Sequence, residues 1–378
     1  MKVRLTVIYI LFLTILLIPM GQMVTRWAPE PELTGAYQQP EKPVLQAQNW
    51  FDGSYQTAFD AYMNDHLGFH NTMVVGRNYL RFALFREVSV PNVLLGKHNY
   101  LYEQDYIDAH YGLDFIGEDS VARQVAKIRR LQDALAENGK TLLVVLAPSK
   151  ADYCPENIPS YQVHPETDQT NYKVFRNLLK EKQVNVVDYN AYFQSQKAVA
   201  KYPLYPVCGI HWSEYSMLGV ADSLKRHIEQ MRGVKLPDIV IYSEKISKEP
   251  QGTDYDLGNL LNLPGQLLTS QELCYPQWYW SDYESEYKPE MIVVADSYYW
   301  GPYNVGFQQY CFQGKFWYYN STVFPDSYDK DLKTSELDIK EALDKAEIVV
   351  IMSTTPGLKV FSWGFVDRAL SEWCDDKK

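Results

Sequence analysis

MIVVADS, residues 291–297, is the stretch that decides the fold. Five apolar residues run without interruption into Asp296 and Ser297, which is typical of a strand buried on both faces of a parallel sheet. Similar runs occur at 141–147 (TLLVVLA), 184–188 (VNVVD) and 347–353 (EIVVIMS). Together they predict the strands of a buried sheet.

Segments with helical periodicity separate these strands. Apolar residues recur at helical spacing from Val121 to Leu135, where Ser120 is placed to cap the helix and Gly139 to end it. Further helices are predicted at 171–182, 214–231 and 337–346. The alternation predicts an α/β fold with a doubly wound, mostly parallel sheet flanked by helices. Ligand chemistry on such a sheet lies at the carboxyl ends of its strands.

The segment 243–290 interrupts this alternation. It is rich in Pro, Gly, Asp and Tyr and has few periodic apolar runs. We expect it to form a long excursion that lines or covers the site.

Ser297 stands at the carboxyl end of the predicted 291–296 strand. A turn there exposes the hydroxyl at the edge of the sheet, with backbone N–H groups nearby that can bind an oxyanion. This is the position of a nucleophile. The alternative is that Asp296 and Ser297 only cap the next helix or turn.

Gly209-Ile210-His211-Trp212-Ser213 supplies a candidate base. A histidine in a loop ahead of a helix, beside a Trp that can exclude water, can take the proton of Ser297. A single histidine is more often structural, and the other six have no comparable setting. Lys150 follows the 141–147 strand and could contact an anionic substrate or simply lie at the surface. With Trp212 and Tyr298 it completes the predicted substrate contacts.

The first residues of the chain predict a membrane anchor. Lys2 and Arg4 precede an uncharged stretch from Leu5 to Thr25, which is long enough to cross a bilayer as a helix. The positive flank favours a cytoplasmic N-terminus and an exported body. No clear cleavage site follows, which favours an uncleaved signal anchor (1–27) over a cleaved signal peptide. A Pro-rich linker (28–48) then leads to one domain, 49–378.

The amino-acid composition limits the classes of ligand that the protein is expected to bind. The net charge of -11 argues against a nucleic-acid partner, which would need a basic surface. Thirty Tyr and nine Trp suit the faces of sugars, although core and rim positions use such residues equally. The five Cys form no C-x-x-C pair, and G-x-S-x-G, H-E-x-x-H and P-loop patterns are absent, so we expect neither a metal nor a cofactor.

His211-Trp212 followed by Asp296-Ser297 resembles the DHHW-type proteins related to the alginate O-acetylation proteins AlgJ and AlgX. Three further stretches are similar to segments of that family: LLGKHNYLY (94–102), APSKADYCPENIP (147–159) and DLGNLLNLP (256–264). These matches span most of residues 50 to 360. The resemblance implies an SGNH-like domain in which the catalytic His precedes the Ser in sequence.

One position departs from the family pattern. Its acetyltransferases carry an Asp two residues before the His, in a D-x-H-W motif, whereas this chain has Gly209. Asp254, Asp256 and Glu214 are candidate replacements, and we favour Asp256 because it begins a family-like segment. A Ser-His dyad held by a backbone carbonyl is the remaining alternative, and capping or solvated roles are open for all three acids.

The resemblance implies acetyl transfer through Ser297 and His211 to hydroxyls of an exported polysaccharide. A membrane-bound O-acyltransferase of the MBOAT type would be the partner, on the periplasmic side of the inner membrane. Two alternatives stay open. One is an esterase that removes acetyl groups from such a polymer, and the other is an inert carbohydrate-binding scaffold, which Gly209 and the many aromatic residues would suit.

Overall fold

The structure, a computed structural model, describes residues 2–35, 39–268, 271–281 and 287–374. The chain divides into two compact units. The smaller contains Met1–Pro91 and Leu257–Leu268, and the larger contains Asn92–Asp256 and Thr269–Lys378. Residues 49–91, which the sequence placed with the sheet, therefore group with the N-terminal helices instead.

The smaller unit is helical. Its helices are α1 (Lys2–Thr25), α2 (Ala47–Phe51), α3 (Ser54–His66) and α4 (His70–Phe85). Among the described helices, α1 alone is long and apolar enough to cross a membrane, over Leu5–Thr25. The returning segment 257–268 is tied into this unit, because Asn78 Nδ2 donates to the Leu261 carbonyl at 3.1 Å and the Asn262 side chain pairs with the backbone of Thr34.

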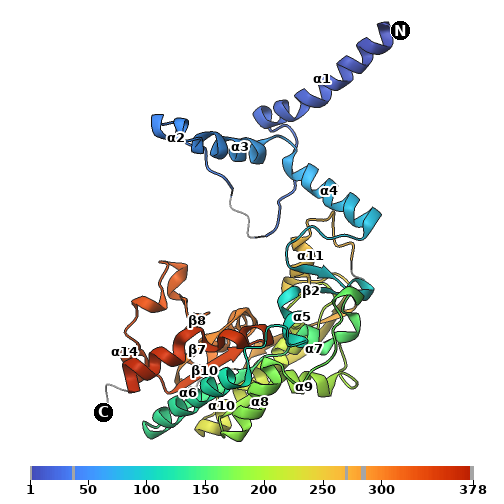
Figure 1. Cartoon of the computed structure of the whole chain (residues 1–378). Helices are drawn as coiled ribbons and strands as arrows, with labels where there is room; N and C mark the ends of the chain where they lie inside the picture. The colour runs from blue at the N-terminus through green and yellow to red at the C-terminus, as the bar shows by residue number, and fades with distance from the viewer. Residues whose placement is uncertain (1, 36–38, 269–270, 282–286, 375–378) are drawn as a thin grey trace. The chain divides into compact units, whose positions relative to one another are not determined.

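A six-stranded sheet forms the centre of the larger unit, in the order β4-β3-β10-β7-β8-β9 (Figure 1). The strands are β3 (Thr141–Leu146), β4 (Val186–Asp188), β7 (Glu290–Ala295), β8 (Gln313–Tyr318), β9 (Thr322–Phe324) and β10 (Ile348–Ser353). All neighbours are parallel except β8 and β9, which pair antiparallel. The predicted α/β fold with a mostly parallel sheet is confirmed, although β8 and β9 were not predicted.

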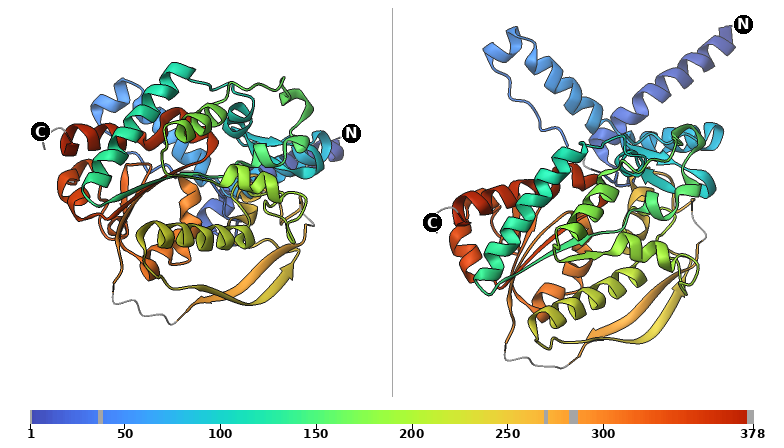
Figure 2. Two further views of the ribbon diagram at one scale, coloured as in Figure 1. Left: turned by 90° about the horizontal axis from the view of Figure 1, so that it is seen from below. Right: turned by 60° about the horizontal axis from the view of Figure 1, so that its bottom comes forward.

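Helices cover both faces of this sheet. They are α5 (Gln104–His110), α6 (Glu118–Glu137), α7 (Lys150–Tyr153), α8 (Asn171–Glu181), α9 (Tyr189–Gln196), α10 (Glu214–Arg232), α12 (Trp300–Asn304), α13 (Phe307–Cys311), α14 (Ile339–Lys345) and α15 (Phe365–Ala369). α6 begins after Gly117, so the predicted cap at Ser120 is wrong. Figure 2 (left) places α6 and α10 on opposite sides of the sheet.

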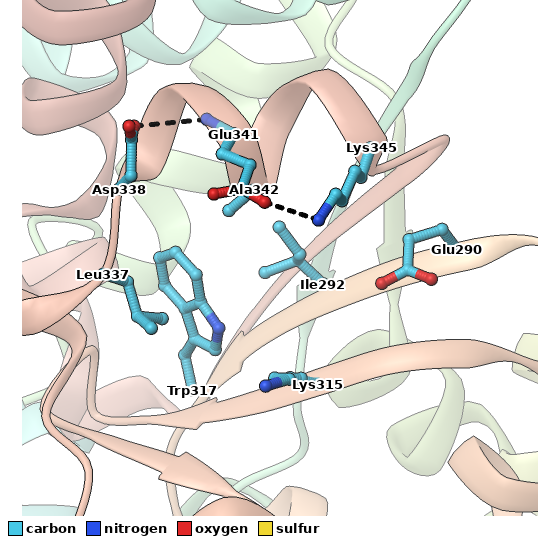
Figure 3. A pocket seen from close by; sticks show the side chains of 9 residues that line it. All are labelled: Glu290, Ile292, Lys315, Trp317, Leu337, Asp338, Glu341, Ala342 and Lys345. Atoms are coloured by element: carbon cyan, nitrogen blue, oxygen red, sulfur yellow. Dashed lines mark hydrogen bonds and ion pairs between the residues drawn. The ribbon is translucent and has the colours of Figure 1, made fainter.

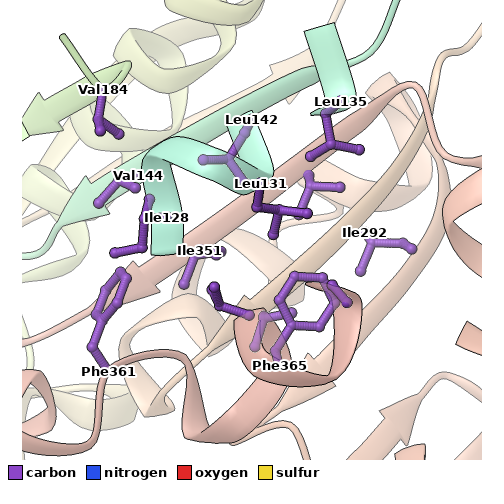
Figure 4. Close-up of a cluster of buried hydrophobic side chains, with 14 of the residues drawn as sticks. Ile128, Leu131, Leu135, Leu142, Val144, Val184, Ile292, Ile351, Phe361 and Phe365 are labelled. Atoms are coloured by element: carbon purple, nitrogen blue, oxygen red, sulfur yellow. The ribbon is translucent and has the colours of Figure 1, made fainter. Parts of the chain in front are cut away.

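The core on the α6 face is aliphatic and aromatic. Alternate strand residues such as Val144, Ile292 and Ile351 meet Ile128 and Leu131 of α6 in one buried cluster (Figure 4). Because side chains alternate across a strand, the intervening strand residues face the other layer of helices. These strands are buried on both sides, which is why they read as unbroken apolar runs in the sequence.

Two antiparallel hairpins accompany the sheet. β1 (Val93–Leu95) pairs with β2 (Leu101–Glu103). β5 (Ile239–Ser247) pairs with β6 (Leu273–Trp280), so the parts 243–247 and 273–280 of the excursion 243–290 form a regular ribbon. Residues 269–270 and 282–286 of that excursion lie outside the described residues. Between β5 and β6 the chain passes through 251–256, the part of the excursion that reaches the site described next.

Candidate active site

The turn after β7 presents Ser297 at the carboxyl end of the sheet. Asp296 fixes this turn, since its Oδ2 accepts the Thr354 N–H at 2.6 Å and the Thr354 hydroxyl at 2.7 Å, and its Oδ1 accepts the Tyr298 N–H at 3.1 Å. Burial raises the pKa of Asp296. Asp296 therefore locks the backbone after β10 to the backbone after β7, a role that its place before Ser297 did not reveal.

His211 faces the Ser297 hydroxyl across this edge. Its Nε2 lies 3.1 Å from Ser297 Oγ. Tyr298 holds the loop that carries His211. Its hydroxyl donates to the Ile210 carbonyl at 2.6 Å, and its ring centroid lies 4.9 Å from that of the His211 ring. The residue after the nucleophile thus positions the histidine loop. The structure brings together the two residues that the sequence paired.

Asp256 lies on the far side of the imidazole. Its Oδ2 is 2.6 Å from His211 Nδ1, and its Oδ1 accepts the Ile210 N–H at 2.9 Å. A carboxylate can only accept, so Nδ1 carries the ring hydrogen and Nε2 is left to accept the serine proton. The carboxylate missing at position 209 is thus supplied from the segment between β5 and β6.

Gly209 makes room for that segment. A Cβ on residue 209 would lie 2.5 Å from the Thr253 carbonyl oxygen and 2.8 Å from Pro206 Cγ. Real Cβ atoms essentially never come so close to backbone atoms. The segment 251–256, which carries Asp256, therefore occupies the space that a side chain at position 209 would need. Glycine at 209 and aspartate at 256 are two parts of one arrangement.

Tyr319, which the sequence did not single out, borders the nucleophile. It follows β8, and its backbone N–H donates to the Ala295 carbonyl at 2.8 Å. Its hydroxyl interacts with both the hydroxyl and the backbone N–H of Ser297, while burial raises its pKa. A Ser297 N–H and a phenol on one side of the nucleophile are the kind of donors that an oxyanion requires.

A pocket opens beside Ser297 and His211. Its wall includes the apolar side chains of Trp212, Met217 and Trp300 and the carboxyl groups of Glu214 and Asp254. Asp254 is only 2% exposed, and burial raises its pKa to about 7. Burial also raises the pKa of Glu214. Of the three acids proposed for His211, Asp256 contacts the imidazole, while the other two line the pocket.

The predicted substrate contacts are placed differently. Lys150 is fully buried, and its ammonium donates to the carbonyls of Val207 at 2.8 Å and Gly209 at 2.6 Å. It is neither a surface lysine nor open to a substrate here, and it holds the loop that leads to His211. Tyr298 is likewise fully buried, so a direct substrate contact does not fit its position. Trp212 is buried but lines the pocket.

A second pocket lies away from this site, on the face of the sheet under α14 (Figure 3). Ile292 and Trp317 form its apolar floor, and Lys345 pairs with Glu341 at 2.6 Å on its rim. The described residues that line this pocket include no nucleophile beside a base. We therefore do not assign the reaction to this pocket.

Asp254→Asn is expected to stabilise the protein more at pH 8 than at pH 5. The folded-state pKa of about 7 exceeds the ordinary value of 3.8, so folding takes up a proton at pH values between the two. The free energy of unfolding therefore falls as pH rises towards 7. The full difference corresponds to at most ~4 kcal/mol, and we expect ~1–3 kcal/mol. Tyr275, Glu214, Asp256 and His211, which interact with Asp254, all remain present in the variant.

Thermal unfolding at the two pH values measures this effect. Asp367→Asn, which removes an exposed carboxylate paired with Lys127, is the matched control and should shift Tm little at either pH. An equal gain for Asp254→Asn at pH 5 and pH 8 would contradict the raised pKa.

Comparisons with known proteins identify the family of the chain. Residues 93–296, more than half of the chain, match the model of the SGNH hydrolase-like domain of the acetyltransferase AlgX. A stretch of 79 residues, 21% of this chain, is 37% identical to the probable alginate O-acetylase AlgJ of Pseudomonas syringae pv. tomato. The chain spans only about a fifth of that relative, 19% of its length.

Two solved structures are similar in fold. The O-acetyltransferase domain of Pseudomonas putida AlgJ aligns with a TM-score of 0.48 and 18% identity, over 71% of this chain and 93% of that one. Pseudomonas aeruginosa AlgX aligns with a TM-score of 0.45 and 13% identity, over 74% of this chain and 68% of that one.

Proposed function

This chain belongs to the family of SGNH hydrolase-like domains of AlgX-type acetyltransferases, and from that membership we propose that it transfers acetyl groups to hydroxyls of an exported polysaccharide through an acetyl-Ser297 intermediate. The observation that carries the proposal is the chain of contacts Asp256–His211–Ser297, at 2.6 Å and 3.1 Å. Nucleophile, base and orienting acid stand in the order that acyl transfer requires.

The reaction has two halves. Ser297 Oγ attacks the acetyl carbonyl while His211 Nε2 takes its proton, and Asp256 stabilises the imidazolium. The Ser297 N–H and the Tyr319 hydroxyl, which contact each other in the structure, are the donors that we propose turn to the oxyanion when it forms. The leaving group receives the proton from His211. A sugar hydroxyl then gives its proton to His211, attacks the acetyl-serine, and leaves as an acetyl ester while Ser297 is restored.

Acetylation of Ser297 tests the proposal directly. The full chain in detergent, incubated with 4-nitrophenyl acetate, should gain the mass of one acetyl group on the peptide that contains Ser297. Acetylated sugar should then form when an oligosaccharide is added. The absence of any acetyl group on Ser297 in folded protein would refute the proposal.

An esterase is the second candidate. Ser297 is only partly buried, so water can reach it and replace the sugar hydroxyl in the second half-reaction. The same incubation separates the two functions, because an esterase yields free acetate at an unchanged rate whether or not the oligosaccharide is present.

We place the protein in the membrane through α1, with its body on the periplasmic side of the inner membrane. The apolar stretch Leu5–Thr25 supports an anchor, and the basic flank at Lys2 and Arg4 supports this orientation. Since acetyl donors are made in the cytoplasm, we propose that a membrane-bound O-acyltransferase of the MBOAT type delivers the acetyl group. Deleting that partner should stop polymer acetylation in cells and leave transfer from 4-nitrophenyl acetate intact.

A further inference from the structure

The pocket beside Ser297 is acidic. Glu214 and Asp254 both line it, and Asp256 lies directly behind His211. Asp254 is 2% exposed, and its Oδ2 has no hydrogen-bond partner among the described residues. The mechanism proposed above uses neither Glu214 nor Asp254. The Asp254 carboxyl bonds to the Tyr275 side chain, but within the described part of the chain its buried Oδ2 has no partner of its own, and such an atom is costly to bury unless a ligand supplies one.

Positive charge does not balance these acids on the pocket side. Among the described residues that line the pocket, none is a lysine or an arginine. Lys150 interacts electrostatically with Asp254 and Asp256. Its buried ammonium, however, already donates hydrogen bonds to the carbonyls of Val207 and Gly209. A carboxylate brought into the pocket would therefore meet like charges and no exposed cation.

The other lining groups suit a hydroxylated ring. Trp212 and Trp300 provide aromatic surface, and the amides of Gln251 and Asn304 can donate and accept hydrogen bonds. Glu214 and Asp254 can accept from sugar hydroxyls. This combination of aromatic surface with acceptors, and without cations, is that of a site for an uncharged sugar.

We propose that the acceptor of this enzyme is a neutral polysaccharide and that the pocket rejects uronic-acid units such as those of alginate. The proposal rests on the acetyl transfer proposed above and adds the class of acceptor. Like-charge repulsion by Glu214 and Asp254 supplies the discrimination at pH 8, where Asp254 is ionised despite its raised pKa, and the partner groups that a uronate would need are absent from the described pocket wall.

Two acceptors that differ only in the carboxylate test this proposal. The full chain in detergent is first acetylated with 4-nitrophenyl acetate, and formation of acetyl-Ser297 is measured before any acceptor is added. It is then offered a β-1,4-linked mannuronate tetramer or the same tetramer with each carboxylate reduced to a primary alcohol. We expect kcat/KM for the reduced tetramer to be at least tenfold higher.

The outcomes distinguish the two proposals. If acetyl-Ser297 does not form, the proposed function fails. If it forms and the mannuronate tetramer is acetylated as well as its reduced form, or if neither tetramer is acetylated, the acceptor assignment is overturned.

Charge removal in the pocket provides the second test. Glu214→Gln, which leaves the buried Asp254 in place, should reduce the preference for the reduced tetramer severalfold, and Glu214→Gln with Asp254→Asn should reduce it further. Glu341→Gln, in the separate pocket of Figure 3, removes an equal charge far from Ser297 and should leave the preference unchanged. A preference that stays the same in the pocket variants would overturn the role of these acids.

Discussion

Ser297→Ala is expected to lower the rate of acetyl transfer by ~10⁴ or more, because it removes the atom that we propose attacks the acetyl group. The fold should be unaffected, since the Ser297 hydroxyl makes its contacts with His211 and Tyr319 and not with the core. Residual turnover would come from the oxyanion donors and from binding alone. The rate of product formation from 4-nitrophenyl acetate measures the loss.

Ser195→Ala is the matched control, because Ser195 is exposed on α9 and its hydroxyl bonds to nearby residues, the Tyr192 carbonyl and the Gln196 side-chain amide. It should keep the activity of the unchanged chain. Retention of activity in Ser297→Ala protein that still unfolds cooperatively would eliminate the serine mechanism.

Asp256→Asn should cost ~10⁴ in kcat, by the effect that an amide has on the tautomer of a catalytic histidine. The amide oxygen can still accept the Ile210 N–H, so the loop should stay folded while His211 loses its anionic partner. Asp105→Asn, at an exposed position of α5, is the control for charge alone. A loss of less than tenfold would show that His211 does not depend on Asp256.

Gly209→Asp should fail to rescue the Asp256→Asn variant, although it restores the family motif D-x-H-W. A side chain at 209 would displace the backbone at Thr253, and with it the segment that carries residue 256. Comparing kcat of the single and double variants decides this point. Recovery of activity in the double variant would mean that the motif position is still open in this chain.

The strands that the sequence revealed are those buried on both faces. β3, β7 and β10 are short runs made largely of Val, Ile and Leu. β8 reads QGKFWY, with polar residues among aromatic ones, because it lies near the edge of the sheet and pairs with the short β9. The ribbon of β5 and β6 was missed for a related reason, since β5 is largely exposed and its short apolar start, IVIY, continues into the polar residues SEK.

The site was predictable only where a motif marked it. Ser297 and His211 follow from a strand end and a loop, and Asp256 was favoured through family resemblance rather than through any local signal. The roles of Lys150 and Tyr298 could not be read, because a lysine satisfied by carbonyls and a buried tyrosine holding a loop leave no pattern in the sequence. Asp254 became informative only once its burial was known.

Asp256 is the last residue before the chain crosses from the larger unit to the smaller one. α11 (Asp256–Leu260) straddles that crossing, and the two residues directly after it, Leu261 and Asn262, bond to Asn78 and Thr34. A shortened protein that starts at residue 92 would keep Ser297, His211 and Asp256. It would, however, lack the hydrogen bonds from Asn78 and Thr34 that hold the segment 257–268. Solubilising this enzyme therefore calls for removing α1 alone and sparing the helices that follow it.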